Sequence, residues 1–205
     1  SGLGSGDVMT QTPRVLETTY DDYLEAARHS PVKLEFHAGE IFAMTGGSVL
    51  HARLGANVVS QLDGALRGKT CRAFNSELRI AITAANEACY PDASVVCGPI
   101  AVDPRDPHGV TNPSVIVEVL SPTTENYDRS GKFGLYRQIA SLQDYLLVSQ
   151  ARNQIEHFSK NTDGSWTYRC AEAGDSVHLT AVDVVLTVAE VFVDADELRA
   201  LEMVG

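Results

Sequence analysis

The sequence predicts a mixed α/β domain in which helices flank a central sheet. The segment Val115–Leu120 is a nearly continuous run of apolar, mostly β-branched residues, which is typical of a strand buried in the middle of a sheet. The segment Val49–Leu66 carries apolar residues at helical spacing, so one of its faces can pack on that sheet. Short segments between turn residues supply the remaining strands.

Length and composition indicate a single domain. The chain has 205 residues, of which 44% are hydrophobic, enough for one full core. Its first six residues, SGLGSG, are typical of a flexible vector-derived leader, so we set residues 1–17 apart and expect one domain over residues 18–205. No apolar run approaches the ~18–20 residues that span a bilayer, and the N-terminus does not read as a signal peptide. We therefore expect a cytoplasmic protein without a membrane partner.

Charge and cysteine usage narrow the class of protein. The formal net charge of −11 argues against loose, non-specific binding of nucleic acid, because phosphate contacts need a basic surface. It leaves open a local basic groove, or a site that becomes cationic when metals bind. The four cysteines show no CxxC spacing, so we interpret them as buried thiols in a reducing compartment, without a zinc or disulfide role.

The N-terminal third is predicted to hold two helices and a hairpin. These elements are a helix capped by Thr18 or Thr19 and ending at His29, a hairpin of Val32–Phe36 and Glu40–Met44 turned at His37–Gly39, and the helix Val49–Leu66 after Gly46–Ser48. In the hairpin Glu35 faces away from Phe36, where it is either a metal ligand or part of a solvated edge strand. His51 lies one residue off the helix stripe and is either a packing or capping group or a catalytic one.

The middle of the chain is predicted to add three strands. They are Cys71–Phe74, Glu77–Thr83 and Tyr90–Cys97, with a turn at Ala84–Ala88 and a proline-rich surface loop at Gly98–Thr111. Lys69, Arg72 and Arg79 are interpreted as solvated surface charges. Asp92 stands at the entry of the third strand and is a candidate acid at the end of a core strand.

The stretch Asn112–Tyr136 carries the strongest functional pattern. Glu118 interrupts the apolar run of the predicted central strand, and a carboxylate there costs several kcal/mol unless it is paired or metal-bound. Ser-Pro then ends the strand, and Thr123 or Thr124 can cap a following helix. That helix carries Lys132 and Tyr136, which are four residues apart and share one face. An acid and a base are therefore expected at one active site.

The C-terminal part is predicted to complete the sheet and end in helices. Its expected strands are Asp144–Ser149, Gln154–Ser159, Ser165–Cys170 and Val177–Thr180, followed by one or two short helices within Thr187–Leu201.

Carboxylates that converge at strand ends form a hard oxygen site suited to Mg²⁺ or Mn²⁺. Such an ion can polarise a phosphodiester oxygen and lower the pKa of a bound water. A nearby lysine can orient or deprotonate that water, or neutralise charge in the transition state. The candidate residues therefore suffice for metal-assisted phosphodiester hydrolysis.

Two stretches carry a resemblance to a known family. The segments PDASVV and NPSVIVEVLSPTTENYDRSGKFGLYRQIASLQDYLLVSQ resemble the Uma2 family (DUF820) of endonucleases, a branch of the PD-(D/E)XK nuclease superfamily. The segment from DDYLEAA to the helix with a histidine resembles the same family, so the likeness covers about Thr18 to Val193. It implies a restriction-endonuclease-like fold, hydrolysis of DNA with Mg²⁺ or Mn²⁺, and a homodimer.

The resemblance also assigns roles by position. It implies that Asp92 and Glu118 are metal ligands and that Glu35 completes the site. The superfamily places a lysine two residues after the second acid, where this chain has Leu120. Lys132 matches the lysine that Uma2 proteins carry on the following helix. Tyr136 and His51 are further candidates of lower rank. The alternative hypothesis is a catalytically inactive nuclease fold that binds nucleic acid or a protein.

Overall fold

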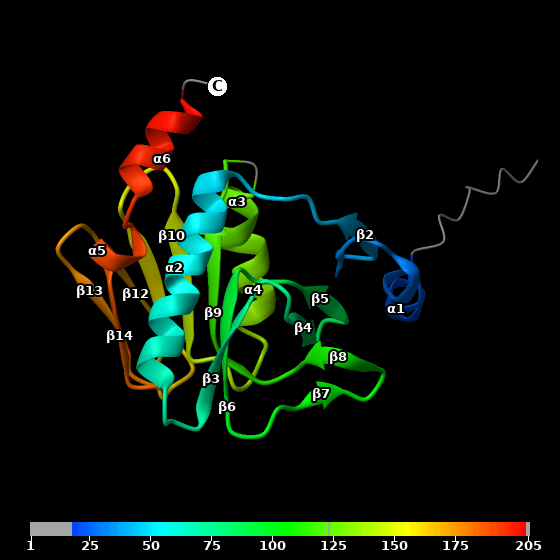
Figure 1. Cartoon of the computed structure of the whole chain (residues 1–205). Coiled ribbons are helices and arrows are strands. Elements are labelled where there is room, and N and C mark those ends of the chain that lie inside the picture. Colours follow the sequence, from blue (N-terminus) through cyan, green and yellow to red (C-terminus); the bar gives the residue numbers. More distant parts are fainter. Residues whose placement is uncertain (1–17, 123, 204–205) are drawn as a thin grey trace, which may run out of the picture.

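A computed structural model of the chain describes residues 18–122 and 124–203, which form a mixed α/β structure (Figure 1). Its helical elements are α1 (Tyr20–His29), α2 (Val49–Leu66), α3 (Glu125–Tyr127), the π-helical turn η1 (Asp128–Lys132), α4 (Phe133–Tyr136), α5 (Val188–Val191) and α6 (Ala195–Glu202). The leader expected within residues 1–17 and the cap expected at Thr123 lie outside the described residues. Within these ranges, no helix combines the length and apolar character needed to cross a bilayer.

The larger core is built on one six-stranded sheet. In spatial order its strands are β12 (Trp166–Ala171), β11 (Ile155–Lys160), β10 (Asp144–Ser149), β9 (Pro113–Leu120), β6 (Ala93–Cys97) and β3 (Cys71–Asn75). The central strands β9 and β10 are parallel, and the other neighbours are antiparallel. The predicted central strand is thus confirmed in the middle of this sheet.

A second six-stranded sheet lies beside it, on the side of α1 in Figure 1. Its order is β2 (Glu40–Ala43), β1 (Leu34–His37), β5 (Glu87–Cys89), β4 (Arg79–Ile82), β8 (Asp106–Val110) and β7 (Val102–Asp103). A small hairpin of β13 (Ser176–Leu179) and β14 (Val184–Thr187) pairs separately. In place of the single central sheet of the sequence prediction, the described residues form two six-stranded sheets and this hairpin.

Helices cover both faces of β9. On one face Leu54 and Leu62 of α2 share a buried cluster with Val117 of β9. On the other face Tyr136 of α4 shares a second cluster with Ile116. Burying one such leucine stabilises the fold by about 1.5–3 kcal/mol relative to leaving it exposed. This arrangement confirms the predicted helix-flanked sheet.

Three predicted helix starts can be compared with the structure. Thr19 caps α1 through a reciprocal pair with Asp22, as expected for one of the two candidate threonines. Ser48 caps α2 by accepting the backbone N–H of His51, and α2 has the predicted bounds. Thr124 occupies the cap position of α3 but makes no side-chain capping bond; its hydroxyl donates instead to Asp128.

The second sheet shows where the sequence prediction is wrong. The predicted surface loop Gly98–Thr111 contains β7 and β8, and part of the turn predicted at Ala84–Ala88 is strand β5. Arg79, interpreted as a solvated charge, is only 8% exposed and donates to Asp106 at 2.5 Å. A buried ion pair thus joins β4 to β8. Strand β8 was missed because the prolines of this segment are typical of a loop.

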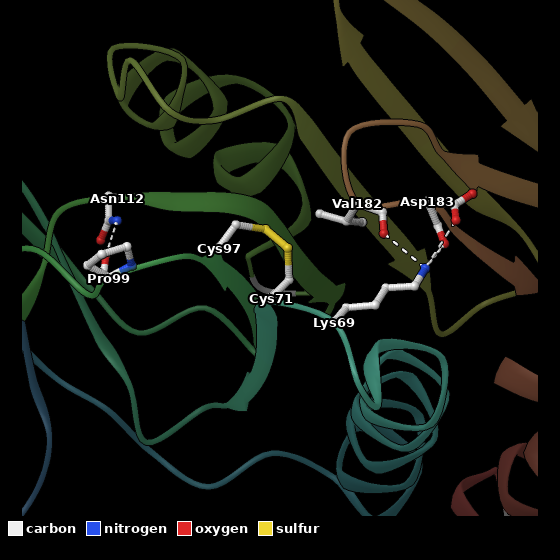
Figure 2. Close-up of a disulfide and its surroundings, with 7 residues drawn as sticks. All are labelled: Lys69, Cys71, Cys97, Pro99, Asn112, Val182 and Asp183. Atoms are coloured by element: carbon white, nitrogen blue, oxygen red, sulfur yellow. Dashed lines mark hydrogen bonds and ion pairs between the residues drawn. A yellow bond between two sulfur atoms is a disulfide. The ribbon is translucent and has the colours of Figure 1, made fainter.

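The cysteines also differ from the prediction. Cys71 of β3 and Cys97 of β6 form a disulfide between neighbouring strands (Figure 2). The two residues are direct cross-strand partners, a relationship that their separation of 26 positions does not reveal. Cys170 is exposed, so the interpretation as buried thiols holds for Cys89 alone.

The C-terminal strands β10 to β13 and helices α5 and α6 match their predicted segments, whereas β14 was not predicted.

Candidate active site

A cavity of about 760 Å³ opens at the carboxyl end of β9, where the two sheets meet. Ligands of α/β proteins commonly bind at this end of parallel strands. Its lining includes most of the candidate residues predicted from the sequence, together with a glycine-containing loop at residues 44–48. The candidates on its wall are Glu35, His51, Asp92, Glu118 and Lys132. Tyr136 is buried beneath them.

Glu118 is a deeply buried acid of this wall. Its side chain is 5% exposed, and its Oε1 atom accepts hydrogen bonds from the Tyr136 hydroxyl at 2.8 Å and from Lys132 Nζ at 3.2 Å. Burial raises the pKa of Glu118 to about 8, although the positive charge of Lys132 lowers it. Side chains alternate along a strand, and Val117 and Val119 point into the core formed with α2. Glu118, which lies between them, therefore points to the opposite face of the sheet.

Lys132 links three carboxylates. Its Nζ lies 3.2 Å from Glu118 Oε1, 3.7 Å from Glu35 Oε1 and 3.7 Å from Asp128 Oδ1. Burial opposes its charge, but the surrounding carboxylates outweigh this and raise the pKa of Lys132 well above its usual range. Lys132 is therefore an ammonium donor in this arrangement, which favours a charge-stabilising role over that of a general base.

Glu35 belongs to this cluster. Its side chain is 13% exposed, and its Oε1 atom accepts the backbone N–H of Tyr90 at 2.7 Å. The strand β1 that carries it pairs on one side with β2 and on the other with β5. This geometry excludes the alternative of a solvated edge strand.

Asp92 is held at both oxygens. Oδ2 accepts the backbone N–H of Val119 at 2.6 Å, and Oδ1 lies 2.8 Å from Nε2 of His51. This hydrogen bond raises the pKa of His51 above its usual value, against the effect of burial. His51 is therefore a partner of the candidate acid and does more than pack on its helix.

Sequence reasoning missed a fourth acid, Asp128. Its side chain is 3% exposed; Oδ2 accepts the Thr124 hydroxyl at 2.7 Å, whereas Oδ1 makes no hydrogen bond. Burial raises the pKa of Asp128. The π-helical turn η1 places Asp128 and Lys132 at one site, and such turns occur frequently at functional sites. The spacing of four before Lys132 was the signal that could have identified Asp128.

The turn η1 also needs a glycine. A Cβ atom on Gly131 would lie 2.5 Å from the ring of Tyr127, which lines the cavity. The ring therefore packs directly on the backbone beside Lys132.

Gln150, which follows β10, is another residue that sequence reasoning missed. It contacts His51, and no strand or helix pattern marks it.

The donor set fits a hard divalent cation in its chemistry. Carboxylate oxygens are the preferred ligands of Mg²⁺ and Mn²⁺, and Asp128 Oδ1 is a buried oxygen without a hydrogen-bond donor. Among the described residues, no three His, Cys, Asp or Glu side chains stand already assembled around one point as metal ligands. The ammonium of Lys132 lies among the acids instead, so an ion would require these side chains to reorient.

The chain matches known proteins along most of its length. The family model described as "Uma2: Putative restriction endonuclease" matches residues 20–189. Two uncharacterized proteins of Synechocystis sp. are similar: slr1290 is 37% identical over 175 residues, covering 84% of this chain and 90% of the relative. The second, sll1609, is 34% identical over 159 residues, covering 78% and 89%.

The fold has a counterpart among solved structures. A crystal structure of "a putative nuclease belonging to DUF820" from Anabaena variabilis matches with a TM-score of 0.70 at 16% sequence identity. The match covers 86% of this chain and 98% of the other. It confirms the predicted restriction-endonuclease-like α/β fold.

Proposed function

Because this chain belongs to the Uma2 family, we propose that it is a divalent-metal-dependent endonuclease that hydrolyses phosphodiester bonds in DNA. One observation carries the proposal. Glu35, Asp92 and Glu118, which come from separate strands or strand entries, line the same cavity as Lys132. Buried acids cost stability unless they are paired or bind a cation, so their convergence indicates a functional site.

In this proposal Asp92 and Glu118 hold Mg²⁺ or Mn²⁺, and Glu35 completes the ligand set. A bound ion would polarise a phosphodiester oxygen and lower the pKa of a water molecule. Counted with Asp128 and fully deprotonated, the four acids and Lys132 would carry a net charge of −3, that is −4 and +1, and a divalent cation that displaces the protons of Glu118 and Asp128 would offset this charge.

Lys132 donates from its ammonium group to an anionic oxygen of the substrate. Charge that develops in the transition state is stabilised by a preorganised donor of this kind. From beneath the cavity wall, Tyr136 supports Glu118 by donating a hydrogen bond to it. At the position where the superfamily places its lysine, Leu120 is 3% exposed and packs in the core with Tyr136. Lys132, carried by η1, takes over its role.

Metal-linked stability tests the ligand set. At a Mn²⁺ concentration about 100 times its dissociation constant, a bound ion stabilises the folded state by about 2.7 kcal/mol. We expect the unfolding midpoint to rise with Mn²⁺ or Mg²⁺ relative to a chelator. Asp92→Ala and Glu118→Gln should abolish the rise, whereas Glu172→Ala, an exposed carboxylate away from the cavity, should retain it. An unchanged rise in both site variants would refute the ligand set.

A second candidate function rests on the position of Lys132. Because its ammonium already pairs with three of the acids without an ion, the same scaffold suits a non-catalytic module that binds nucleic acid or protein. DNA binding without any metal-linked stabilisation would favour this function.

We further propose that the nuclease is a cytoplasmic homodimer. Sedimentation equilibrium of the reduced and oxidised protein would test the oligomeric state.

A further inference from the structure

We infer that Gln150 is a positioning residue of this site, which holds His51 as an imidazole protonated on Nε2 and thereby fixes Asp92. Gln150 follows β10 and is half-buried between α2 and the end of β9. Its side chain contacts three groups: the Ser48 hydroxyl, the Leu120 carbonyl and the His51 ring. The inference deepens the proposed nuclease function, on which its catalytic consequence rests.

The orientation of the Gln150 amide follows from two of these contacts. The carbonyl oxygen of Leu120, 2.7 Å away, can only accept, so the NH₂ group must face it. The Ser48 hydroxyl donates to Oε1 at 3.1 Å. With the amide placed in this way, its second N–H points to Nδ1 of His51, at a distance of 3.3 Å.

This orientation decides the tautomer of His51. Because Gln150 presents a donor, Nδ1 must accept with its lone pair, and the proton of the neutral ring is on Nε2. Nε2 then donates to Asp92 Oδ1 at 2.8 Å. Since Val119 N–H holds the other oxygen at 2.6 Å, the carboxylate of Asp92 has one fixed orientation at the cavity wall.

Two further contacts keep the ring and the amide in place. A Cβ atom on Gly47 would lie 2.7 Å from Cδ2 of His51, so the ring packs on glycine backbone that no other residue provides. Arg199 of α6 donates from Nε to the backbone carbonyl of Gln150 at 2.6 Å. Helix α6 therefore stabilises the position of the turn that carries Gln150.

Gln150 acts on catalysis indirectly, because it orients the proposed metal ligand Asp92 through His51. Groups that orient a metal ligand typically contribute 10–100-fold in metal affinity or activity. We expect Gln150→Leu to weaken Mn²⁺ binding by about this factor, although Gln150 itself touches neither ion nor substrate in the proposal.

The tautomer can be measured without metal or substrate. Long-range ¹H–¹⁵N spectra of metal-free protein at about pH 9, above the usual pKa of histidine, distinguish a protonated from an unprotonated ring nitrogen. His51→Gln assigns the signals. The wild type should show a protonated Nε2 and a hydrogen-bonded, unprotonated Nδ1. Gln150→Glu offers only an acceptor and should move a proton to Nδ1, and Gln150→Leu should remove the hydrogen-bond shift of Nδ1.

Gln138→Glu is the matched control. Gln138 is exposed and bonds to the carbonyl of Gly134, so the same change of charge there should leave the His51 signals unaltered. A wild-type ring protonated on Nδ1, or His51 signals that are identical in the wild type and both Gln150 variants, would overturn the inference. The spectra are independent of nuclease activity, so their outcome separates failure of this inference from failure of the proposed function.

Discussion

Lys132 Nζ lies 3.2 Å from Glu118 Oε1, although the two residues are 14 positions apart and belong to different elements. Strand β9 carries the acid to the cavity, and the helical segment α3–η1–α4 returns the lysine to it. The contact joins a carboxylate whose pKa burial raises to about 8 with an ammonium whose pKa its acidic neighbours raise. This pair is the centre of the proposed active site.

The raised pKa of Glu118 predicts a pH dependence of stability. The pKa rises from 4.5 in the unfolded chain to about 8 in the folded state, because burial disfavours the charged form. The folded state therefore binds more protons than the unfolded chain between these two pH values. The stability that this proton binding contributes is fully present below about pH 4.5 and is lost as pH rises to about 8. Glu118→Gln cannot lose a proton, and the wild type should lose stability relative to it across this range.

The measurement is urea unfolding of both proteins at several pH values with a chelator present. One pKa unit corresponds to about 1.4 kcal/mol, so the difference between the two proteins should change by a few kcal/mol. Parallel stability profiles for the two proteins would show that Glu118 titrates normally.

At about pH 9, where Glu118 with its pKa of about 8 is charged, Tyr136→Phe should destabilise the protein by about 1.5–3 kcal/mol, the contribution of a hydrogen bond to a charged group. The hydroxyl is buried and donates to Glu118 Oε1 at 2.8 Å, so its removal leaves a buried carboxylate with one donor fewer. Tyr168→Phe is the control, because Tyr168 is 52% exposed, and it should change the free energy of unfolding by less than about 0.5 kcal/mol. Equal effects in the two variants would contradict a supporting role for Tyr136.

Gly131→Ala should disturb the site through the turn η1. The added Cβ atom would lie 2.5 Å from the ring of Tyr127, so either the ring or the backbone beside Lys132 must move. Gly134→Ala is the matched control: it lies in α4, nothing stands within 4 Å of its Cβ position, and it should be neutral or stabilise the helix by up to about 1 kcal/mol. Thermal unfolding and crystal structures of both variants check this. A Gly131→Ala protein with an unmoved ring and wild-type stability would disprove the packing argument.

The sequence predicted the parts of this site that depend on local pattern. The alternation of β1 identifies Glu35, and a single acid in an apolar run identifies Glu118. Asp128 escaped although it stands four residues before Lys132, because carboxylates on solvated helix faces show the same spacing. Gln150 escaped because it lies in a turn and acts through side chains from other segments.

The fold shows the same division between local and distant causes. The bounds of α2 follow from a capping serine and an apolar stripe within one segment. Strand β8 instead depends on the contact between Asp106 and Arg79, 27 positions apart. The disulfide depends on the register between β3 and β6. Such pairings are fixed by the packed sheets, and linear spacing does not encode them.

The most direct test is cleavage of supercoiled and single-stranded DNA with Mn²⁺. It compares the wild type with Asp92→Ala, Lys132→Met and the control Lys160→Met, whose native lysine bonds to the carbonyl of Ala140. We expect the wild type and the control to cleave, and both site variants to lose activity by a factor of about 100 or more. For Lys132→Met this is the typical cost of removing a transition-state donor, and Asp92→Ala removes a proposed metal ligand. Equal cleavage by Lys132→Met and wild type, or no cleavage by a wild type that binds Mn²⁺, would contradict the proposed active site.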